Sequence, residues 1–136
     1  MSAWQYGMPA GAAGDVEVVK SVYDAFARRD LEAIAAVIAP DAQLLGGPTA
    51  QEAEVDEPYR GVDGLRRYFA DVASVWDTLS AYPEDFRAAA TGSVVVFGRL
   101  VSVADDKEIS RRVIWTWRLR DGLIISLRVN VLRESE

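Results

Sequence analysis

The chain has 136 residues, half of them hydrophobic, which is typical of one domain with a single hydrophobic core. It contains no cysteine and no histidine, so disulfide bonds and thiolate nucleophiles are excluded, as are the commonest general base and the commonest metal ligand. The formal net charge is −6, which makes nucleic acid an unfavourable partner because phosphate backbones are also negative.

Residues 1–14 are predicted to form a flexible tail ahead of a single domain over residues 15–136. The tail is rich in Gly and Ala, and it lacks the basic residues and the apolar run of a signal peptide. Its aromatic residues Trp4 and Tyr6 are candidates for docking onto the domain, and their role stays open. No apolar run approaches the roughly 20 residues of a membrane span. We therefore expect a cytoplasmic protein that has no contact with membranes and needs neither metal nor cofactor.

Three helices are predicted in the first half of the domain. The first begins with Asp15 as its N-cap and ends near Arg28, the second covers residues 30–39, and the third begins at residues 61–63. Apolar residues recur in each helix at spacings of three and four, which indicates one buried face. The inward positions are Val18, Val19, Val22, Tyr23 and Phe26, then Leu31, Ile34, Val37 and Ile38, then Leu65, Tyr68, Phe69, Val72, Val75 and Trp76.

Strands dominate the second half. A short strand is predicted over residues 42–45, ending at the Gly46–Gly47–Pro48 break. Four more are predicted over residues 78–86, 93–103, 108–120 and 123–134, the first of them bent at Pro83. Asp121–Gly122 is a strong signal for a two-residue hairpin between the last two strands. This order predicts an α+β fold, with the helices packed on one face of a curved sheet.

An acidic run lies between the short strand and the third helix. It contains Glu52, Glu54, Asp56 and Glu57, and we favour a solvated loop or edge strand for it. The alternative is that one of these carboxylates turns into a cavity.

The last hairpin has one apolar face. In a strand, alternate side chains point to opposite sides of the sheet. The odd-numbered positions are apolar: Val113, Trp115, Trp117, Leu119, Leu123, Ile125, Leu127, Val129 and Val131. Burying either tryptophan contributes roughly 4–6 kcal/mol at about 25 cal/mol/Å². The odd face is therefore predicted to meet the helices.

Arg111 shares this parity and has two interpretations: it lies at the mouth of a cavity, or it lies in solvent at the strand end.

In the preceding strand we place Gly98 inward, where a missing side chain leaves space. Phe97, Val101 and Ile114 then lie on the outer face among arginines. Such a half-apolar face suits a homodimer interface.

Five segments carry a further signal: VVKSVYDAFARRDLEAIAAVIAPDAQL, PYRGVDGLRRYF, PEDF, SVVVFGRL and VIWTWRLRDGLIISLR. Together, over about residues 15–132, they resemble the SnoaL-like branch of the nuclear transport factor 2-like superfamily. The resemblance implies a cone-shaped fold, in which a strongly curved, mixed or antiparallel sheet wraps three helices around a cavity. The family includes polyketide cyclases, ketosteroid isomerases, epoxide hydrolases, dehydratases and domains that only bind, so the fold does not by itself identify an activity.

The catalytic residues of these relatives are not retained. By the resemblance, the base, the tyrosine and the second acid of a ketosteroid isomerase fall at Gly46, Val22 and Trp115. The cyclases pair Asp with His, and this chain has no His. The hydrolases use an Asp–Arg–Asp set, for which Arg111 is the candidate arginine and no carboxylate shares its face of the hairpin.

Three functional hypotheses remain open. The first is an enzyme of the isomerase, cyclase or hydrolase type that acts on a small apolar molecule, such as a polycyclic or terpenoid one. Its candidate proton-transfer groups are Glu52, Glu54, Asp56 and Asp85, with Tyr23 or Tyr59 as hydrogen-bond donors. The second is a module that binds an apolar ligand, or a dimeric regulatory or assembly module, without catalysis. The third is a cone filled by its own aromatic residues.

We expect an open cavity that holds a small apolar molecule. Its predicted ligand-binding residues are Val22, Tyr23, Phe26, Tyr59, Phe69, Trp76, Leu100, Trp115, Trp117, Leu127, Val129 and Val131, with Arg111 at the mouth.

Overall fold

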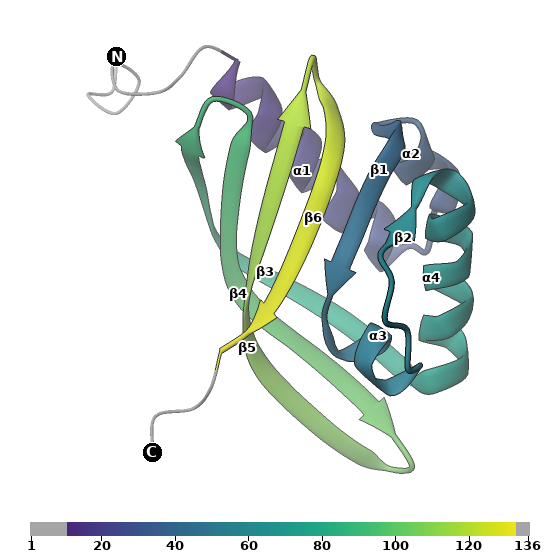
Figure 1. Ribbon diagram of the computed structural model, residues 1–136. Helices are drawn as coiled ribbons and strands as arrows, with labels where there is room; N and C mark the ends of the chain where they lie inside the picture. Colours follow the sequence, from purple (N-terminus) through teal and green to yellow (C-terminus); the bar gives the residue numbers. More distant parts are fainter. Residues whose placement is uncertain (1–10, 133–136) are drawn as a thin grey trace.

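A six-stranded mixed sheet organises the chain. The computed structural model describes residues 11–132. The helices are α1 (Ala12–Ala27), α2 (Leu31–Ala35), α3 (Pro48–Glu52) and α4 (Gly61–Val75). The strands are β1 (Ile38–Gly46), β2 (Tyr59–Arg60), β3 (Thr78–Ala90), β4 (Ser93–Ala104), β5 (Lys107–Arg120) and β6 (Leu123–Val131). Their order is β2-β1-β6-β5-β4-β3, with β1 and β6 parallel and the other pairs antiparallel (Figure 1).

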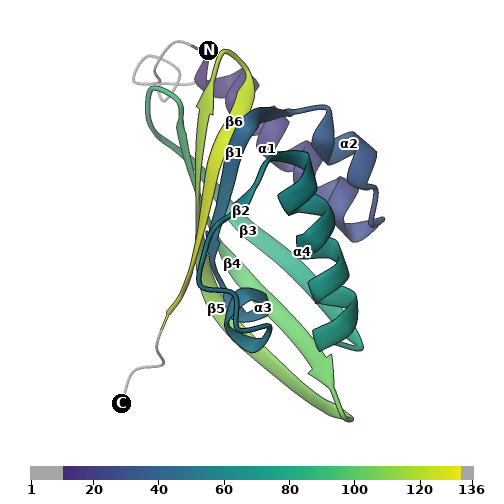
Figure 2. The ribbon, with the colours of Figure 1, turned by 45° about the vertical axis from the view of Figure 1, so that its right-hand side comes forward.

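The helices lie on one side of this sheet, and within residues 11–132 none covers the other side (Figure 2). α1 crosses the sheet near β3 and β4, and α4 packs beside β1 and β2. The predicted α+β class with a curved mixed sheet is confirmed. The structure also contains the short helix α3, which was not predicted. Among the described residues, no helix is both long and apolar enough to cross a membrane.

Gly98 lies where the curved sheet needs a missing side chain. The inward face of β4 contains Gly98 and its buried neighbours Val96 and Leu100, as predicted from the alternation. A Cβ atom on Gly98 would lie 2.2 Å from the backbone oxygen of Tyr82 and 3.0 Å from Cζ3 of Trp115. Next to it, the register of β3 shifts between Pro83 and Asp85, which agrees with the predicted bend. The space at Gly98 is therefore taken by the Trp115 ring and the bent strand.

A bulge in β6 corrects the prediction for the last hairpin. Arg118 pairs with Ser126, but Leu119 pairs with Ile124, so Ile125 is an extra residue in β6. The extra residue reverses the alternation before it: Ile124 is 3% exposed and Leu123 is 37% exposed. The prediction that the odd-numbered side chains face the helices thus holds for β5. In β6 it holds only after the bulge.

Val131 is a second correction, since this predicted inward residue is 44% exposed. It pairs with Val113 on one side. On the other side, β1 ends at Gly46 opposite Val129, so no neighbouring strand flanks Val131.

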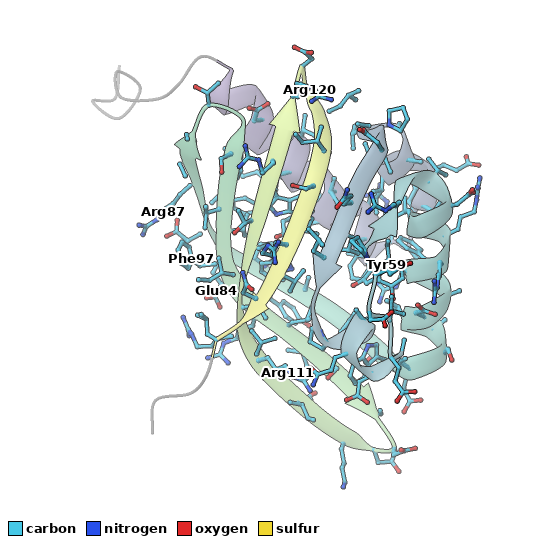
Figure 3. All side chains as sticks on the ribbon, in the orientation of Figure 1. Tyr59, Glu84, Arg87, Phe97, Arg111 and Arg120 are labelled. Atoms are coloured by element: carbon cyan, nitrogen blue, oxygen red, sulfur yellow. The ribbon has the colours of Figure 1, made fainter. Side chains whose placement is uncertain are left out.

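The uncovered face of the sheet carries apolar residues among charged ones. Phe97 and Ile114 are cross-strand partners there, and both are half-buried. Arg87 lies over the Phe97 ring at 5.5 Å and pairs with Asp85 at 2.8 Å. Figure 3 shows Arg87, Phe97 and Glu84 grouped beside β3 and β4.

Several predicted boundaries differ from the structure. α1 begins at Ala12, so its N-cap is Gly11, and Asp15 lies in the first turn, where a carboxylate interacts favourably with the helix dipole. α2 ends at Ala35, because the chain then enters β1, with Ile38 paired to Ile124. The acidic run contains the end of α3 and leads to the edge strand β2. Trp4 and Tyr6 lie outside the described residues.

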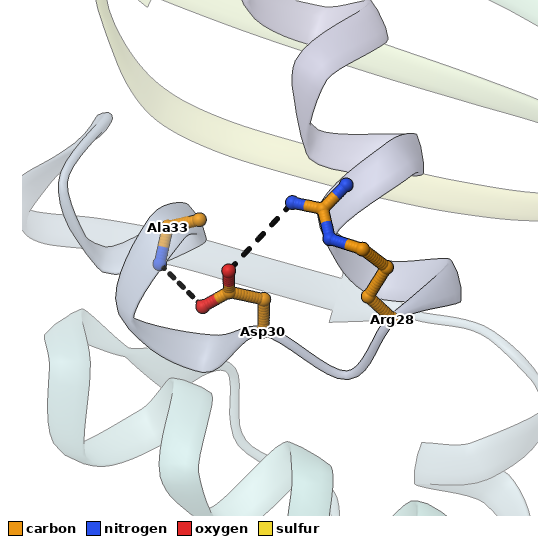
Figure 4. Close-up of polar contacts among 3 residues, drawn as sticks. All are labelled: Arg28, Asp30 and Ala33. Atoms are coloured by element: carbon orange, nitrogen blue, oxygen red, sulfur yellow. Dashed lines mark hydrogen bonds and ion pairs between the residues drawn. The ribbon is translucent and has the colours of Figure 1, made fainter.

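The start of α2 follows its sequence signal. Asp30 is the N-cap, and its side chain accepts a hydrogen bond from the backbone N–H of Ala33 at 3.1 Å (Figure 4). Arg28 approaches the other carboxylate oxygen at 3.6 Å. The cap fixes the start of α2 directly after the end of α1, and the two helices contact each other.

Replacing Gly98 with alanine should destabilise the fold by about 2 kcal/mol, in the range found for overpacked cores. The reason is that the Tyr82 oxygen belongs to backbone and cannot rotate away from the new Cβ atom. Chemical denaturation measures the effect. The control is Gly14→Ala in α1, where a Cβ atom meets nothing within 4 Å. Equal stability of Gly98→Ala and wild type would contradict the close approach.

The bulge predicts that substitutions at two adjacent residues destabilise the fold to different extents. Ile124→Ala should lower the free energy of unfolding by about 2–4 kcal/mol, as expected for a buried aliphatic residue. Leu123→Ala should lower it by less than about 1 kcal/mol, because its side chain is partly exposed. Thermal or denaturant unfolding of the two variants decides between this register and an unbroken alternation, which would reverse the order.

Candidate functional site

A cavity of about 120 Å³ lies between the helices and the concave face of the sheet. Side chains from α1, α2 and α4 form one wall, and side chains from the strands form the other. The lining residues are Val22, Tyr23, Phe26, Ile34, Ile38, Ala42, Gln43, Leu44, Tyr59, Gly61, Leu65, Tyr68, Phe69, Ala81, Leu100, Trp115, Trp117, Ile124, Leu127 and Val129. The wall is therefore almost entirely apolar and aromatic.

Most of the predicted site residues meet at this cavity. Those that line it are Val22, Tyr23, Phe26, Tyr59, Phe69, Leu100, Trp115, Trp117, Leu127 and Val129. Trp76, Arg111 and Val131 do not line it. Whether the lining residues bind a ligand stays a prediction.

Some lining residues were not predicted as part of the site. Ile34, Leu65 and Tyr68 were placed on inward helix faces, and that signal could have identified them. Ala42 and Leu44 line the cavity because β1 pairs with β6, a parallel contact that the local sequence pattern does not encode. Ile124 was missed because the bulge reverses its side.

The central feature of the wall is Tyr23, which packs against two tryptophans. Its ring lies edge-on to Trp115, with centroids 5.2 Å apart, and edge-on to Trp117 at 5.5 Å. The indole Nε1 of Trp117 donates a hydrogen bond to the Tyr23 hydroxyl oxygen at 3.2 Å. α1 is thereby attached to β5 through both aromatic packing and a polar contact.

A second aromatic group covers the α4 side. Phe26, Phe69 and Tyr68 pack together, with Phe26 and Phe69 edge-on at 5.9 Å. Tyr59 lies edge-on to Tyr68 at 5.3 Å, and its hydroxyl donates to Oδ2 of Asp71 at 2.7 Å. Asp71 does not itself line the cavity.

The three tyrosines of the wall are held in their neutral form. Burial raises the pKa of Tyr23 well above its usual range, and the hydrogen bond from Trp117 offsets part of this effect. Burial also raises the pKa of Tyr59, and the hydrogen bond and charge of Asp71 raise it further. Burial likewise raises the pKa of Tyr68. All three phenols are therefore uncharged at neutral pH.

Trp76 and Arg111 belong to a separate group of polar contacts outside the cavity lining. The indole Nε1 of Trp76 donates to Thr49 Oγ1 at 3.0 Å, and both residues are buried. Arg111 lies over the Trp76 ring at 5.9 Å and donates to Ser102 at 2.9 Å. Figure 3 shows Arg111 at the lower part of the sheet, away from Tyr59. Both sequence-based placements of Arg111 are thus corrected: it is half-buried against Trp76.

None of the candidate carboxylates lines the cavity. Glu52, Glu54 and Asp56 are exposed, and Asp85 pairs with Arg87 on the outer face of the sheet. Asp56 borders a second hollow of about 390 Å³, which shares Leu44 and Tyr59 with the cavity. Residues 11–132 contain no cluster of three side chains able to hold a metal ion.

Comparison with solved structures supports the fold. A nuclear transport factor 2-like protein of unknown function from Burkholderia pseudomallei is 20% identical, with 88% of this chain and 91% of that chain covered and a TM-score of 0.78. TerC, crystallised with polyporic acid, is 21% identical, with 88% and 92% covered and a TM-score of 0.79. A protein from Jannaschia sp., provisionally named a SnoaL-like polyketide cyclase, is 15% identical, with 88% and 85% covered and a TM-score of 0.71.

At these identities the structures show a shared fold and not a shared activity. A comparison with curated proteins gave no match. The model of the SnoaL-like domain, by contrast, matches residues 19–127. This match spans most of the chain and includes both walls of the cavity, and the chain therefore belongs to the family of SnoaL-like domains.

Proposed function

We propose that the cavity binds one small, neutral, hydrophobic molecule. The observation that carries this proposal is the chemistry of the wall: among the described residues, its ionisable side chains are three tyrosines that stay uncharged. A charged ligand would lose its hydration without gaining an opposite charge, which is strongly unfavourable. An apolar ligand gains the burial of its own surface and contacts with the aromatic rings.

The size of the cavity favours a ligand with a single ring. Its volume of about 120 Å³ is close to that of an engineered cavity of about 150 Å³ that holds benzene. Sites for larger organic molecules have volumes of about 300–1,000 Å³. A polycyclic or terpenoid ligand would need more space, for example by opening toward the neighbouring hollow past Leu44 and Tyr59.

Binding is better supported than proton-transfer catalysis. General acid–base chemistry needs a group that can take up a proton within hydrogen-bond reach of the substrate. No carboxylate within residues 11–132 lines the cavity, and Asp71 is separated from it by Tyr59, whose hydroxyl donates to that carboxylate. TerC, which has the same fold, was crystallised with polyporic acid, and this supports a ligand-binding role for such a cavity.

Filling the cavity should weaken binding. Ala42 is buried in the wall, so Ala42→Leu places added carbon atoms in the space of the ligand. We expect toluene to bind the wild type, anthracene not to bind, and Ala42→Leu to lose at least about tenfold in affinity, corresponding to about 1.4 kcal/mol. Calorimetric titration and quenching of tryptophan fluorescence measure these affinities.

The matched control is Ala73→Leu on the exposed side of α4, which should bind toluene as the wild type does. The proposal is wrong if toluene fails to bind the wild type, or if both leucine variants weaken binding equally.

The uncovered sheet face is proposed to pair with a second copy of the chain. Phe97 and Ile114 form an apolar centre on this face. Around them lie arginines and carboxylates: Arg87, Arg99, Arg112, Arg118, Arg128, Glu84 and Asp85. A two-fold axis through the centre would bury the apolar residues, and it would allow arginines of one copy to meet carboxylates of the other.

Light scattering at micromolar concentration tests the dimer. We expect a mass twice the 14.9 kDa of one chain, and a monomer for Ile114→Asp, because the new carboxylate would lose its hydration in the apolar centre of the interface. Ile109→Asp introduces the same charge on the opposite face of β5, at an exposed residue, and should remain dimeric. A monomeric wild type overturns the proposal.

A further inference from the structure

The hydrogen bond between Trp117 and Tyr23 has a fixed direction. An indole N–H can donate but cannot accept, so the Tyr23 oxygen must be the acceptor in the 3.2 Å contact. The hydroxyl proton of Tyr23 is therefore left for another partner. Within residues 11–132 the structure gives this proton no acceptor, although the residue lines the cavity.

The other two tyrosines of the wall are engaged differently. The Tyr59 hydroxyl donates a hydrogen bond to the carboxylate of Asp71 at 2.7 Å. For Tyr68 the polar neighbour is Thr49, whose hydroxyl oxygen accepts from the indole of Trp76 at 3.0 Å. The Tyr59 hydroxyl thus has an acceptor in the protein, whereas the Tyr23 hydroxyl stays available to donate to a ligand.

The surroundings of Tyr23 favour an acceptor atom opposite that proton. A hydroxyl that accepts a hydrogen bond becomes a stronger donor, because the two bonds polarise each other. The ring is fixed edge-on between Trp115, Trp117 and Phe86, so the hydroxyl has a defined position. In an apolar cavity, a ligand oxygen that met no donor would lose its bond to water without replacement.

We propose that Tyr23 is a specificity-determining residue and that the ligand is a neutral, single-ring compound with a carbonyl oxygen, such as an aromatic ketone or aldehyde. The carbonyl accepts the Tyr23 proton, and the ring lies against the two tryptophans. This inference rests on the proposed function, because it assigns a ligand class to the same cavity.

A pair of ligands of the same shape tests the role of Tyr23. Acetophenone and α-methylstyrene differ only by a carbonyl oxygen in place of a CH₂ group. We expect the wild type to bind acetophenone about three- to tenfold more tightly, as one neutral hydrogen bond of about 0.5–1.5 kcal/mol allows. Tyr23→Phe keeps the ring and removes the hydroxyl, so it should lose this preference and bind α-methylstyrene at least as tightly as acetophenone, because the carbonyl oxygen then meets no donor.

Tyr68→Phe is the matched control, since it removes a hydroxyl from the same wall and should retain the preference. If Tyr68→Phe loses the preference and Tyr23→Phe keeps it, the assignment to Tyr23 is overturned. Equal binding of both compounds to the wild type also overturns it, while the proposed function stands. Failure of both compounds to bind would instead remove the proposed function.

A measurement on the wild type covers the case in which Tyr23→Phe does not fold. The carbonyl stretching frequency of bound acetophenone should be lower than in hexane, because a hydrogen bond weakens the C=O bond. A frequency equal to that in hexane would show that the oxygen meets no donor, and this would overturn the inference independently of any variant.

Discussion

The close approach of Trp115 to Gly98 is the constraint on which the cavity depends. The Trp115 ring lies where any side chain at position 98 would be, and the backbone of β3 at Tyr82 comes even closer. This contact lets β3 bend at Pro83 and keeps the indole close to the backbone of the sheet at Gly98. Tyr23 of α1 then packs on Trp115 and Trp117. A bulkier residue at Gly98 would raise the indole toward α1 and reduce the space between the helices and the sheet.

Local periodicity explains why much of this fold could be predicted from the sequence. The alternation of β5 is uninterrupted, so Trp115 and Trp117 were placed on the buried face correctly. The alternation of β6 failed at Ile125, because a bulge depends on pairing and not on residue type. β6 pairs with β5 on one side and with β1 on the other, and its register must satisfy both. Distant pairing of this kind is not encoded in the local pattern.

The candidate site shows the same limit. Parity indicates which face of a sheet a residue occupies, but it does not indicate how far along the strand the cavity extends. Arg111 has the parity of Trp115, and yet it lies nearer the start of β5, where Trp76 and Ser102 are its neighbours. Tyr68 shares its helix face with Phe69, and it became part of the wall through the docking of α4 against α1 and β2. How far along a strand or helix the cavity lining extends is set by tertiary packing.

The identity of residue 115 also limits what the cavity can do. By resemblance, this position corresponds to an acid in a ketosteroid isomerase, and here it is a buried indole. A carboxylic acid at this place could exchange protons with a ligand, whereas a tryptophan offers a flat apolar surface. On the α1 side of the wall, the Tyr23 hydroxyl accepts a hydrogen bond from the indole of Trp117. Because the pKa of Tyr23 is raised, this hydroxyl donates a hydrogen bond without giving up its proton. Such a wall presents a hydroxyl group to a ligand, and among residues 11–132 no carboxylate lines it.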